Sequence, residues 1–449
     1  MKYPRYPTYK ESGAEWIGEI PEHWDVKRLK FVSKIQFSNV DKHSFDREMP
    51  VLLANYTDVY KNQFITTEME FMEATANLNE IKKFHLEVGD ILVTKDSETP
   101  DDIAIPALVK STLPNLLCGY HLAMLKPNSH SLDSNYLFYL YSDKKFRGKY
   151  ESEANGITRF GLSQESFSDT FICIPDISEQ RTISLFLEEQ TSKIDYLISK
   201  TQIMINLLKE KRQAIITNAV TKGLDPNVPM KDSGVEWIGE IPEHWEIKPL
   251  FSLMRESKTK NTEDENLEVL SLSYGNIIIR DVDNNFGLLP ESFATYQVVD
   301  KGNIILRLTD LQNDKKSLRV GLVKKRGIIT SAYVCLQTSV DLIPEFAYFM
   351  LHSYDIRKVF YGFGGGVRQS MTFKDLKHLP LVYPSTDEQI QIIEHIKTEI
   401  DKLDILILKQ EKVIELLREY RTSLISHAVT GKIDVRSFAV PINLNSTRT

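Results

Sequence analysis

Residues 175–225 read "PDISEQRTISLFLEEQTSKIDYLISKTQIMINLLKEKRQAIITNAVTKGLD", and residues 384–434 repeat this stretch without a gap as "PSTDEQIQIIEHIKTEIDKLDILILKQEKVIELLREYRTSLISHAVTGKID". The second copy begins 209 residues after the first, the difference between 384 and 175. Internal self-similarity governs the architecture, because each copy is expected to fold as the same element. The chain is therefore predicted to be an internal duplication.

Apolar residues in both copies recur every three or four positions, which predicts two long helices. This row comprises Ile183, Leu187, Ile194, Leu197, Met204, Leu208 and Ile215 in the first copy and Ile392, Ile396, Leu403, Leu406, Val413, Leu417 and Leu424 in the second. A sustained heptad spacing is typical of a coiled-coil seam. A further apolar row widens the stripe, so that it can bury more than one partner; its members are Ile198, Ile205, Ile216, Ile407, Ile414 and Ile425. We expect the helices to pack antiparallel.

A tryptophan-bearing phrase is also repeated, as "SGAEWIGEIPEHW" at 12–24 and "SGVEWIGEIPEHW" at 233–245. Near-identity in both copies favours a structural joint at each domain entry over a pocket that reads something variable. The beginning of the chain resembles the sequence that follows the first helix, as if the chain were closed into a ring. We therefore expect the two chain ends to lie close together, beside the first insert.

Two unlike inserts, 25–174 and 246–383, separate these repeated frames. Only fragments correspond: "GDILV" from Gly89 with "GNIIL" from Gly302, and residues 159–163 with 368–372. Short apolar runs bounded by Gly, Pro and Asn predict strands, and helical spacing lies between them. The predicted fold class is α/β (α+β), with pseudo-two-fold duplication. The predicted parts are 1–174, the helix 175–225, 226–383, the helix 384–434 and a tail, 435–449.

Composition describes an ordinary globular protein, with 42% hydrophobic and 26% charged residues. No apolar run is long enough to cross a membrane, and the first residues lack a secretory signal, so we expect a cytoplasmic protein without membrane contact. The three cysteines are too few and too far apart for a disulfide framework or a zinc site, which favours buried free thiols. A net charge of −7 does not exclude a basic face.

Catalytic motifs are sparse. The sequence contains no GxxxxGK[ST] phosphate loop and no HExxH zinc motif. The glycine-rich "FGGGVRQS" at 363–370 has no accompanying [DN]PP[YF] motif for base methylation, so it favours a turn. One enzymatic alternative is a metal-dependent nuclease that uses Asp101 and Asp143. We expect no catalysis, no cofactor and no metal in this chain.

Clustered cations favour contact with nucleic acid, because lysine and arginine neutralise phosphates and arginine and glutamine can read base edges. One run lies in the first insert and one in the second: Lys144, Lys145, Arg147 and Lys149, then Lys315, Lys316, Arg319, Lys324, Lys325 and Arg326. Lys95 and Arg307 follow the matched strand fragments. Arg159, Arg368 and Gln369 are predicted on loops before each insert's last strand.

These features together resemble the DNA-specificity subunit of type I restriction-modification systems, over essentially the full length. The resemblance rests on the paired "EWIGEIPEHW" phrases and on the strand and proline that close each insert, at 173–175 and 382–384. Glu179-Gln180 and Glu388-Gln389 then open the two helices. The order of these motifs, twice over, carries the resemblance.

The resemblance implies two target-recognition domains, each reading one half of a bipartite site in double-stranded DNA, held apart by the helices. Because the inserts differ, we expect an asymmetric target. The resemblance also implies a non-catalytic chain that docks two modification subunits and further restriction subunits. S-adenosylmethionine, ATP and Mg are implied for those partners, not for this chain. The alternative is an orphan DNA-binding or scaffold protein without methylase partners.

Overall fold

A computed structural model describes residues 3–14, 16–261, 267–280, 293–311, 313–314, 318–363 and 370–438. It has the predicted mixed α/β fold, divided into two compact units. Unit 1 comprises Met1–Lys200 with Val413–Thr449, and unit 2 comprises Thr201–Lys412. The packing thus joins each globular domain to the adjoining part of both long helices, whereas the division by sequence at 174, 225, 383 and 434 separates them. That division stays a prediction.

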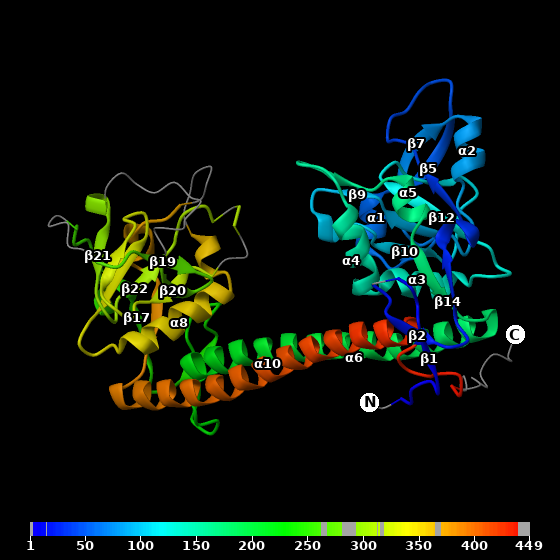
Figure 1. Ribbon diagram of the computed structural model, residues 1–449. Coiled ribbons are helices and arrows are strands. Elements are labelled where there is room, and N and C mark those ends of the chain that lie inside the picture. The colour runs from blue at the N-terminus through cyan, green and yellow to red at the C-terminus, as the bar shows by residue number, and fades with distance from the viewer. Residues whose placement is uncertain are drawn as a thin grey trace, which may run out of the picture. The chain divides into compact units, whose positions relative to one another are not determined.

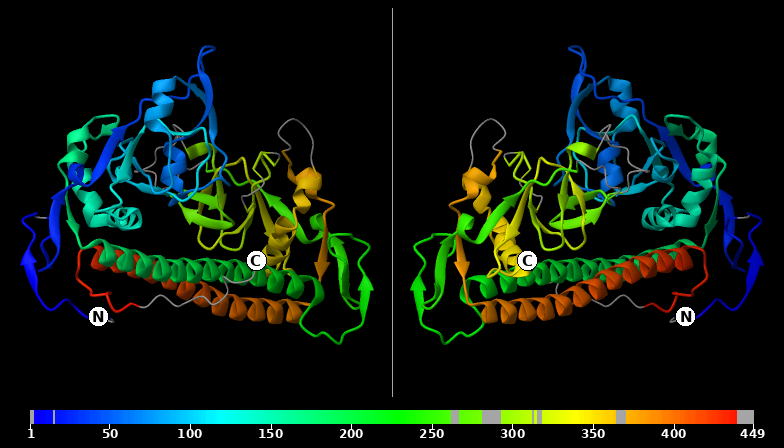
Figure 2. Two further views of the ribbon diagram at one scale, coloured as in Figure 1. Left: turned by 90° about the vertical axis from the view of Figure 1, so that its right-hand side faces the viewer. Right: turned by 90° about the vertical axis from the view of Figure 1, so that its left-hand side faces the viewer.

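Two long helices form where the repeated segments lie: α6 spans Ile177–Lys222 and α10 spans Thr386–Val429 (Figure 1). They run side by side in opposite directions within each unit (Figure 2). In unit 1 the first part of α6 shares a core with the last part of α10, and in unit 2 the reverse holds. The antiparallel prediction is confirmed.

The buried row of these helices differs from the predicted seam. It repeats every eleven residues: Ile183, Ile194, Ile205 and Ile216 in α6, then Ile392, Leu403, Ile414 and Ile425 in α10, all buried. Eleven residues over three turns give 3.67 residues per turn, near the 3.6 of a straight α-helix, whereas a heptad requires 3.5. The heptad prediction is wrong at the helix centres, because a straight helix rotates away from a heptad seam. Leu197, Met204, Leu406 and Val413 are exposed there.

The domain of unit 1 is built on a five-stranded sheet of order β4-β12-β8-β10-β6. Its strands are β4 (Ser33–Phe37), β12 (Leu122–Pro127), β8 (Ile91–Thr94), β10 (Pro106–Val109) and β6 (Phe64–Ile65). A three-stranded sheet adds β11 (Leu116–Cys118), β5 (Met49–Ala54) and β7 (Met72–Ala76). The helices are α1 (Tyr56–Lys61), α2 (Leu78–Phe84), α3 (Ser134–Ser142), α4 (Lys144–Glu153) and α5 (Gln164–Ser168).

The domain of unit 2 is built on a four-stranded sheet of order β18-β25-β22-β23. Its strands are β18 (Met254–Ser257), β25 (Val334–Thr338), β22 (Ile304–Leu306) and β23 (Val320–Leu322). Strand pairs add β19 (Leu270–Ser273), β20 (Asn276–Ile279), β21 (Gln297–Val299) and β24 (Gly327–Ile329). The helices are α7 (Leu250–Leu253), α8 (Pro344–Ile356) and α9 (Phe373–Leu376).

The two domains share a strand order despite their unlike sequences. β4, β12, β8 and β10 occupy the places of β18, β25, β22 and β23, and every neighbouring pair in both sets is antiparallel. The duplication therefore extends through the inserts as a backbone arrangement, with side chains that differ.

Each domain is joined to the frame by a hairpin and a strand pair. The hairpins are β1 (Tyr9–Glu11) with β2 (Glu19–Pro21) and β15 (Met230–Asp232) with β16 (Glu240–Pro242). The pairs are β3 (Asp25–Arg28) with β14 (Phe171–Ile174) and β17 (Glu246–Pro249) with β26 (Pro380–Tyr383). The last tryptophan of each repeated phrase follows its hairpin directly.

That tryptophan is enclosed by both helices. In the first socket, formed by Trp24, Glu179 and Gly431, the indole Nε1 of Trp24 donates to Glu179 Oε1 at 3.2 Å near the start of α6. Gly431, just beyond the end of α10, packs on the same ring. The second socket repeats this with Trp245, Glu388 and Gly223, and its indole donates at 3.0 Å. The predicted structural joint is confirmed.

The described ends of the chain meet in unit 1. The backbone amide of Asp434 donates to the carbonyl of Pro4 at 2.8 Å, and the Tyr9 hydroxyl donates to the carbonyl of Gly431 at 3.1 Å. The expected closeness of the two ends beside the first domain is confirmed. The three cysteines are free and buried, as predicted. No helix among the described residues is long and apolar enough to cross a membrane.

Candidate DNA interface

Three strand ends of the first domain converge at one edge of its sheet. Because β12 is antiparallel to both neighbours, it begins where β4 and β8 end, with Ala123 opposite Phe37 and Leu122 opposite Thr94. The residues just beyond these pairs are 37–39, 95–97 and 120–121, and we call them the first edge. Polar and aromatic side chains occupy it, including Asn39, Asp96, Tyr120 and His121.

Asp96 is the centre of charge at the first edge. Its carboxylate lies 2.8 Å from Lys95 Nζ and 3.6 Å from Arg159 Nε. His121 Nδ1 lies 2.5 Å from Asp96 Oδ1, although their alignment is not that of a hydrogen bond, and neither atom has a hydrogen-bond partner among the described residues. The backbone brings Arg159 here, because β13 (Phe160–Gly161) pairs with β9 (Asp96–Ser97). Three cationic or basic groups therefore surround one carboxylate.

A cavity of about 640 Å³ opens beside this cluster. It is lined by Arg159, His121 and Tyr120 and also by Asn55 and Lys42. Lys95 Nζ lies 4.8 Å from the centre of the Tyr120 ring, a cation–π contact that fixes both groups at the rim. The surface offers hydrogen-bond donors, acceptors and an exposed aromatic ring, the set used to read nucleic-acid bases.

The second domain has the same edge with other residues. β25 begins where β18 and β22 end, with Cys335 opposite Ser257 and Val334 opposite Leu306. The residues beyond these pairs are 257–260, 307–309 and 331–333, and we call them the second edge. A cavity of about 260 Å³ lies here, lined by Lys258, Lys260, Gln297, Tyr333 and Thr372 among others.

The predicted pair Lys95 and Arg307 lies at these two edges, one in each domain. Both are ion-paired: Lys95 with Asp96, and Arg307 through Nη2 with Asp314 Oδ2 at 3.3 Å. Arg159 reaches the first edge from its loop. The structure therefore brings together Lys95 and Arg159 among the residues predicted in the first insert.

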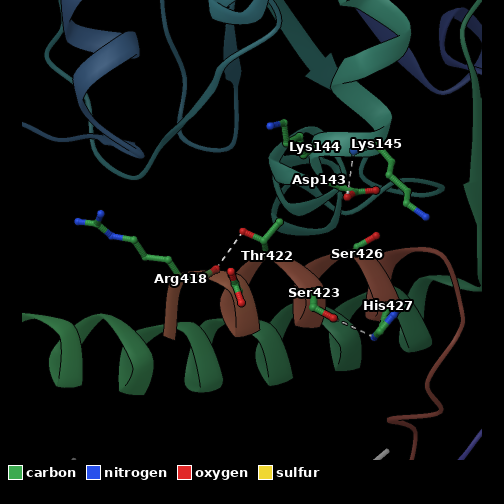
Figure 3. A pocket seen from close by; sticks show the side chains of 9 residues that line it. Asp143, Lys144, Lys145, Arg418, Thr422, Ser423, Ser426 and His427 are labelled. Carbon is green, nitrogen blue, oxygen red and sulfur yellow. Dashed lines mark hydrogen bonds between the residues drawn. The ribbon is translucent and has the colours of Figure 1, made fainter. Parts of the chain in front are cut away.

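The basic run of the first insert lies elsewhere. Lys144 and Lys145 begin α4 and line a cavity of about 660 Å³ that faces α10 (Figure 3). Arg147 is half-buried, and burial lowers its pKa. Lys149 Nζ is held by Thr170 Oγ1 at 2.9 Å and by Glu153 at 2.8 Å. Lys149 is thus ion-paired within the domain, and DNA contact by Arg147 and Lys149 stays a prediction.

The basic run of the second insert is also divided. Arg319 is completely buried and donates to the carbonyls of Arg307 and Thr309 at 3.1 and 2.9 Å. Its prediction as a DNA contact is wrong, because the guanidinium is enclosed by the protein and donates its hydrogen bonds to backbone carbonyls. Three others are exposed in the turn after β23, at the opposite end of the sheet from the second edge: Lys324, Lys325 and Arg326. Four predicted residues lie outside the described residues: Lys315, Lys316, Arg368 and Gln369.

Asp101 and Asp143, the residues of the nuclease alternative, belong to no metal-ligating cluster in the described part of the chain. Asp143 is almost fully buried and caps α4, accepting from the Lys145 amide at 3.3 Å, and burial raises the pKa of its carboxyl. Asp101 lies in a short 3-10 turn, Pro100–Asp102. Among the described residues, no group of three or more metal-ligating side chains is present.

The sequence-based search missed Asp96, Tyr120 and His121. It looked for runs of cations, whereas these residues are single and come from separate strand ends. One signal was available: Asp96 follows Lys95 three residues after the matched "GDILV" fragment, and the same place in the second insert is Thr309. The charged Asp96 and the uncharged Thr309 at matched positions indicate that the two domains differ in their surface chemistry at this place.

Comparison with known proteins agrees with these features. Residues 21–207 match the family model of the type I restriction modification DNA specificity domain. The MjaX specificity subunit of a type I restriction enzyme of Methanocaldococcus jannaschii is 25% identical over 443 residues, covering 96% of this chain and 98% of the relative. The EcoKI specificity subunit of Escherichia coli K12 is 20% identical over 440 residues, covering 93% and 90%.

Solved structures share the fold. A chain from a structural study of complex assembly and conformational transition in the type I R-M system has a TM-score of 0.64 at 14% identity and covers 91% of this chain and 98% of its own. The HsdS subunit from Thermoanaerobacter tengcongensis has a TM-score of 0.53 at 14% identity, with coverage of 92% and 98%. With its paired sockets, its antiparallel helices and these matches, the chain is similar to type I restriction-modification specificity subunits over most of its length.

Proposed function

We propose that the chain recognises a split, asymmetric DNA target, with one half-site read by each domain and unspecified bases between them. The observation that carries this is the pair of matched sheet edges: the strand order is the same, but the side chains at the edges differ. A duplicated frame that holds unlike surfaces suits two unlike half-sites. The helices would set the length of the spacer.

The helices also expose apolar side chains at matched positions. Four pairs are separated by the repeat offset of 209 residues: Tyr196 with Ile405, Leu197 with Leu406, Met204 with Val413, and Leu207 with Leu416. Each unit carries one member of every pair. Contiguous exposed apolar surface is rare on monomeric proteins and typically marks a binding site.

Two equivalent apolar surfaces support two modification subunits, one on each unit, with restriction subunits joining that complex. S-adenosylmethionine, ATP and Mg would belong to those partners, and this chain would supply recognition without catalysis. An orphan protein without methylase partners would not need apolar side chains exposed at matched positions of its two helices. Because the complex would act on genomic DNA, we expect the protein to be cytoplasmic.

Selection from a randomised DNA library tests the proposed function. The full chain, co-expressed with its modification subunits, is expected to enrich two short constant blocks with unspecified bases at a fixed spacing. A single continuous motif would contradict the two-reader account. Enrichment by the chain alone, with no complex formed, would favour the orphan alternative.

A further inference from the structure

The two edges differ most in how they hold a cation. At the first edge, Asp96 is only 15% exposed and lies against Arg159 on the Nε side of the guanidinium. At the matched position the second edge has Thr309, whose carbonyl accepts from the buried Arg319. The arginine of the second edge is Arg307, whose terminal Nη2 is paired with Asp314 Oδ2 at 3.3 Å, so among the described residues only the arginine of the first edge is engaged by a carboxylate at Nε.

Arg159 is fixed at its base and free at its tip. Its side chain is 56% exposed and lines the cavity of the first edge. The ion pair engages Nε, and the terminal Nη atoms have no partner among the described residues. Two parallel donors at the end of an oriented arginine match the O6 and N7 acceptors that guanine presents in the major groove.

The backbone that follows Arg159 and the carboxylate beside it are both anchored. The Phe160 and Gly161 strand pairs with Ser97 and Asp96, and the amide of Leu162 donates to the carbonyl of Lys95 at 2.9 Å. Lys95 neutralises the other carboxylate oxygen of Asp96 at 2.8 Å. Asp96 is thus held in place by Lys95, and its other oxygen, which His121 Nδ1 approaches at 2.5 Å, faces Arg159 Nε.

We infer that the first edge is the base-reading surface of unit 1, and that Arg159, positioned by Asp96, reads a guanine of its half-site through the major groove. This inference rests on the proposed function and makes it specific. Arg159 discriminates the base, and Asp96 is a positioning residue. The second edge, where Asp314 engages a terminal Nη atom of Arg307, reads its half-site by other contacts.

The test repeats the library selection with the full chain and its modification subunits, using Arg159→Lys. Lysine keeps the charge but loses the paired donors. We expect one guanine position of one half-site to lose discrimination by roughly 5- to 150-fold, while the other half-site stays unchanged. Asp96→Asn is expected to relax the same position by a smaller factor, a result that a purely structural role would not produce.

Two controls separate base reading from phosphate contact. Arg28, an exposed arginine in β3 of the same domain that is paired with Asp169 at 3.2 Å, is the matched variant, and Arg28→Ala should leave the motif unchanged. Replacing the identified guanine by 7-deazaguanine removes N7, and should weaken binding of the wild-type chain but not of Arg159→Ala.

The outcomes are distinct. If Arg159→Ala weakens all sequences equally and lowers the salt slope by about one, the residue contacts phosphate and the inference is overturned. If Arg159→Lys retains the wild-type motif, it is likewise overturned while the proposed function stands. If the wild-type chain enriches no split target, the proposed function fails and the inference falls with it.

Discussion

Gly431 and Gly223 lie just beyond the two long helices, each with a positive φ, +69° and +73°. This left-handed conformation is strained for residues with a side chain. The surroundings differ: a Cβ on Gly431 would lie 2.3 Å from Pro21, whereas on Gly223 the nearest atom is a Trp245 ring carbon at 3.3 Å. The first socket is therefore the tighter of the two.

We expect both alanine variants to be destabilised, and Gly431→Ala to be the worse. Gly223→Ala should lower the free energy of unfolding by about 1–2 kcal/mol through backbone strain. Gly431→Ala adds overpacking worth roughly 1–3 kcal/mol. Urea unfolding of both variants measures the difference, and equal losses would contradict the distinction between the sockets.

Glu388 gives the second socket a dependence on pH. Partial burial alone would raise the pKa of Glu388, but hydrogen bonds from Trp245, His244 and Ser385 outweigh it and lower the pKa to about 2. Because the folded-state pKa is lowered, the stabilisation is fully present above the ordinary value of about 4.5 and is lost as pH falls towards 2.

Glu388→Gln should therefore cost about 1–3 kcal/mol near pH 6, because the charged acceptor is lost. The difference in melting temperature between wild type and variant should shrink below pH 4.5 and close near pH 2. Thermal unfolding between pH 6 and pH 2 measures it. Glu394→Gln, at an exposed position of the same helix, is the control and should show no such trend.

At the residue scale, the sequence indicated which side chains are cationic but not which are accessible. Arg159 is exposed, yet Arg319 is buried, because the segment 307–314 that precedes it folds back and places its carbonyls around the guanidinium. Such convergence depends on the tertiary fold. The strand ends that unite Asp96 with His121 depend on it as well.

The helices were predictable in extent and direction, but the buried row was not predicted correctly. Both apolar rows were visible in the sequence, but the buried row takes Ile183 and Ile194 from one and Ile205 and Ile216 from the other. The structure shows Ile205 at 1% exposure and its neighbour Met204 at 49%. The eleven-residue spacing was present in the sequence and is the signal that would have identified the buried row.

Adjacent residues of α6 provide a matched test of the buried row. Ile205→Ala should lower the free energy of unfolding by about 2–4 kcal/mol, since it leaves a cavity between the helices. Met204→Ala should change it by less than about 1 kcal/mol, as is usual at an exposed position. Urea unfolding compares them; a larger loss for Met204→Ala would restore the heptad seam.

At the scale of the whole molecule, the duplication predicts duplicated binding. Leu207 and Leu416 are exposed at matched positions, one in each unit. Leu207→Glu or Leu416→Glu should each remove one of two modification subunits, and the double variant should remove both, because a charge in an apolar contact is costly. The isolated chain should remain folded, since neither side chain is buried.

Native mass spectrometry of the co-expressed complex counts the bound subunits. Asn218→Glu adds the same charge at an exposed polar position of α6 and is the control, with two subunits retained. Loss of both subunits in either single variant would contradict independent docking on the two units.

The internal duplication, the two mixed α/β domains and the joints could be predicted because repeated sequence makes repeated structure. The reading surfaces could not, because they lie in the inserts, where the copies share a strand order but few residues. Their location became apparent only when the strand registers placed Asn39, Asp96 and His121 at one edge.

The central claim is that this chain directs methylation to a split target, and a long-read methylation map of the host genome with and without its gene tests it most directly. The account predicts that one asymmetric adenine motif, in two blocks with a fixed unspecified spacer, disappears when the gene is removed. If the chain is expressed beside intact modification subunits and no motif changes, the recognition role is contradicted.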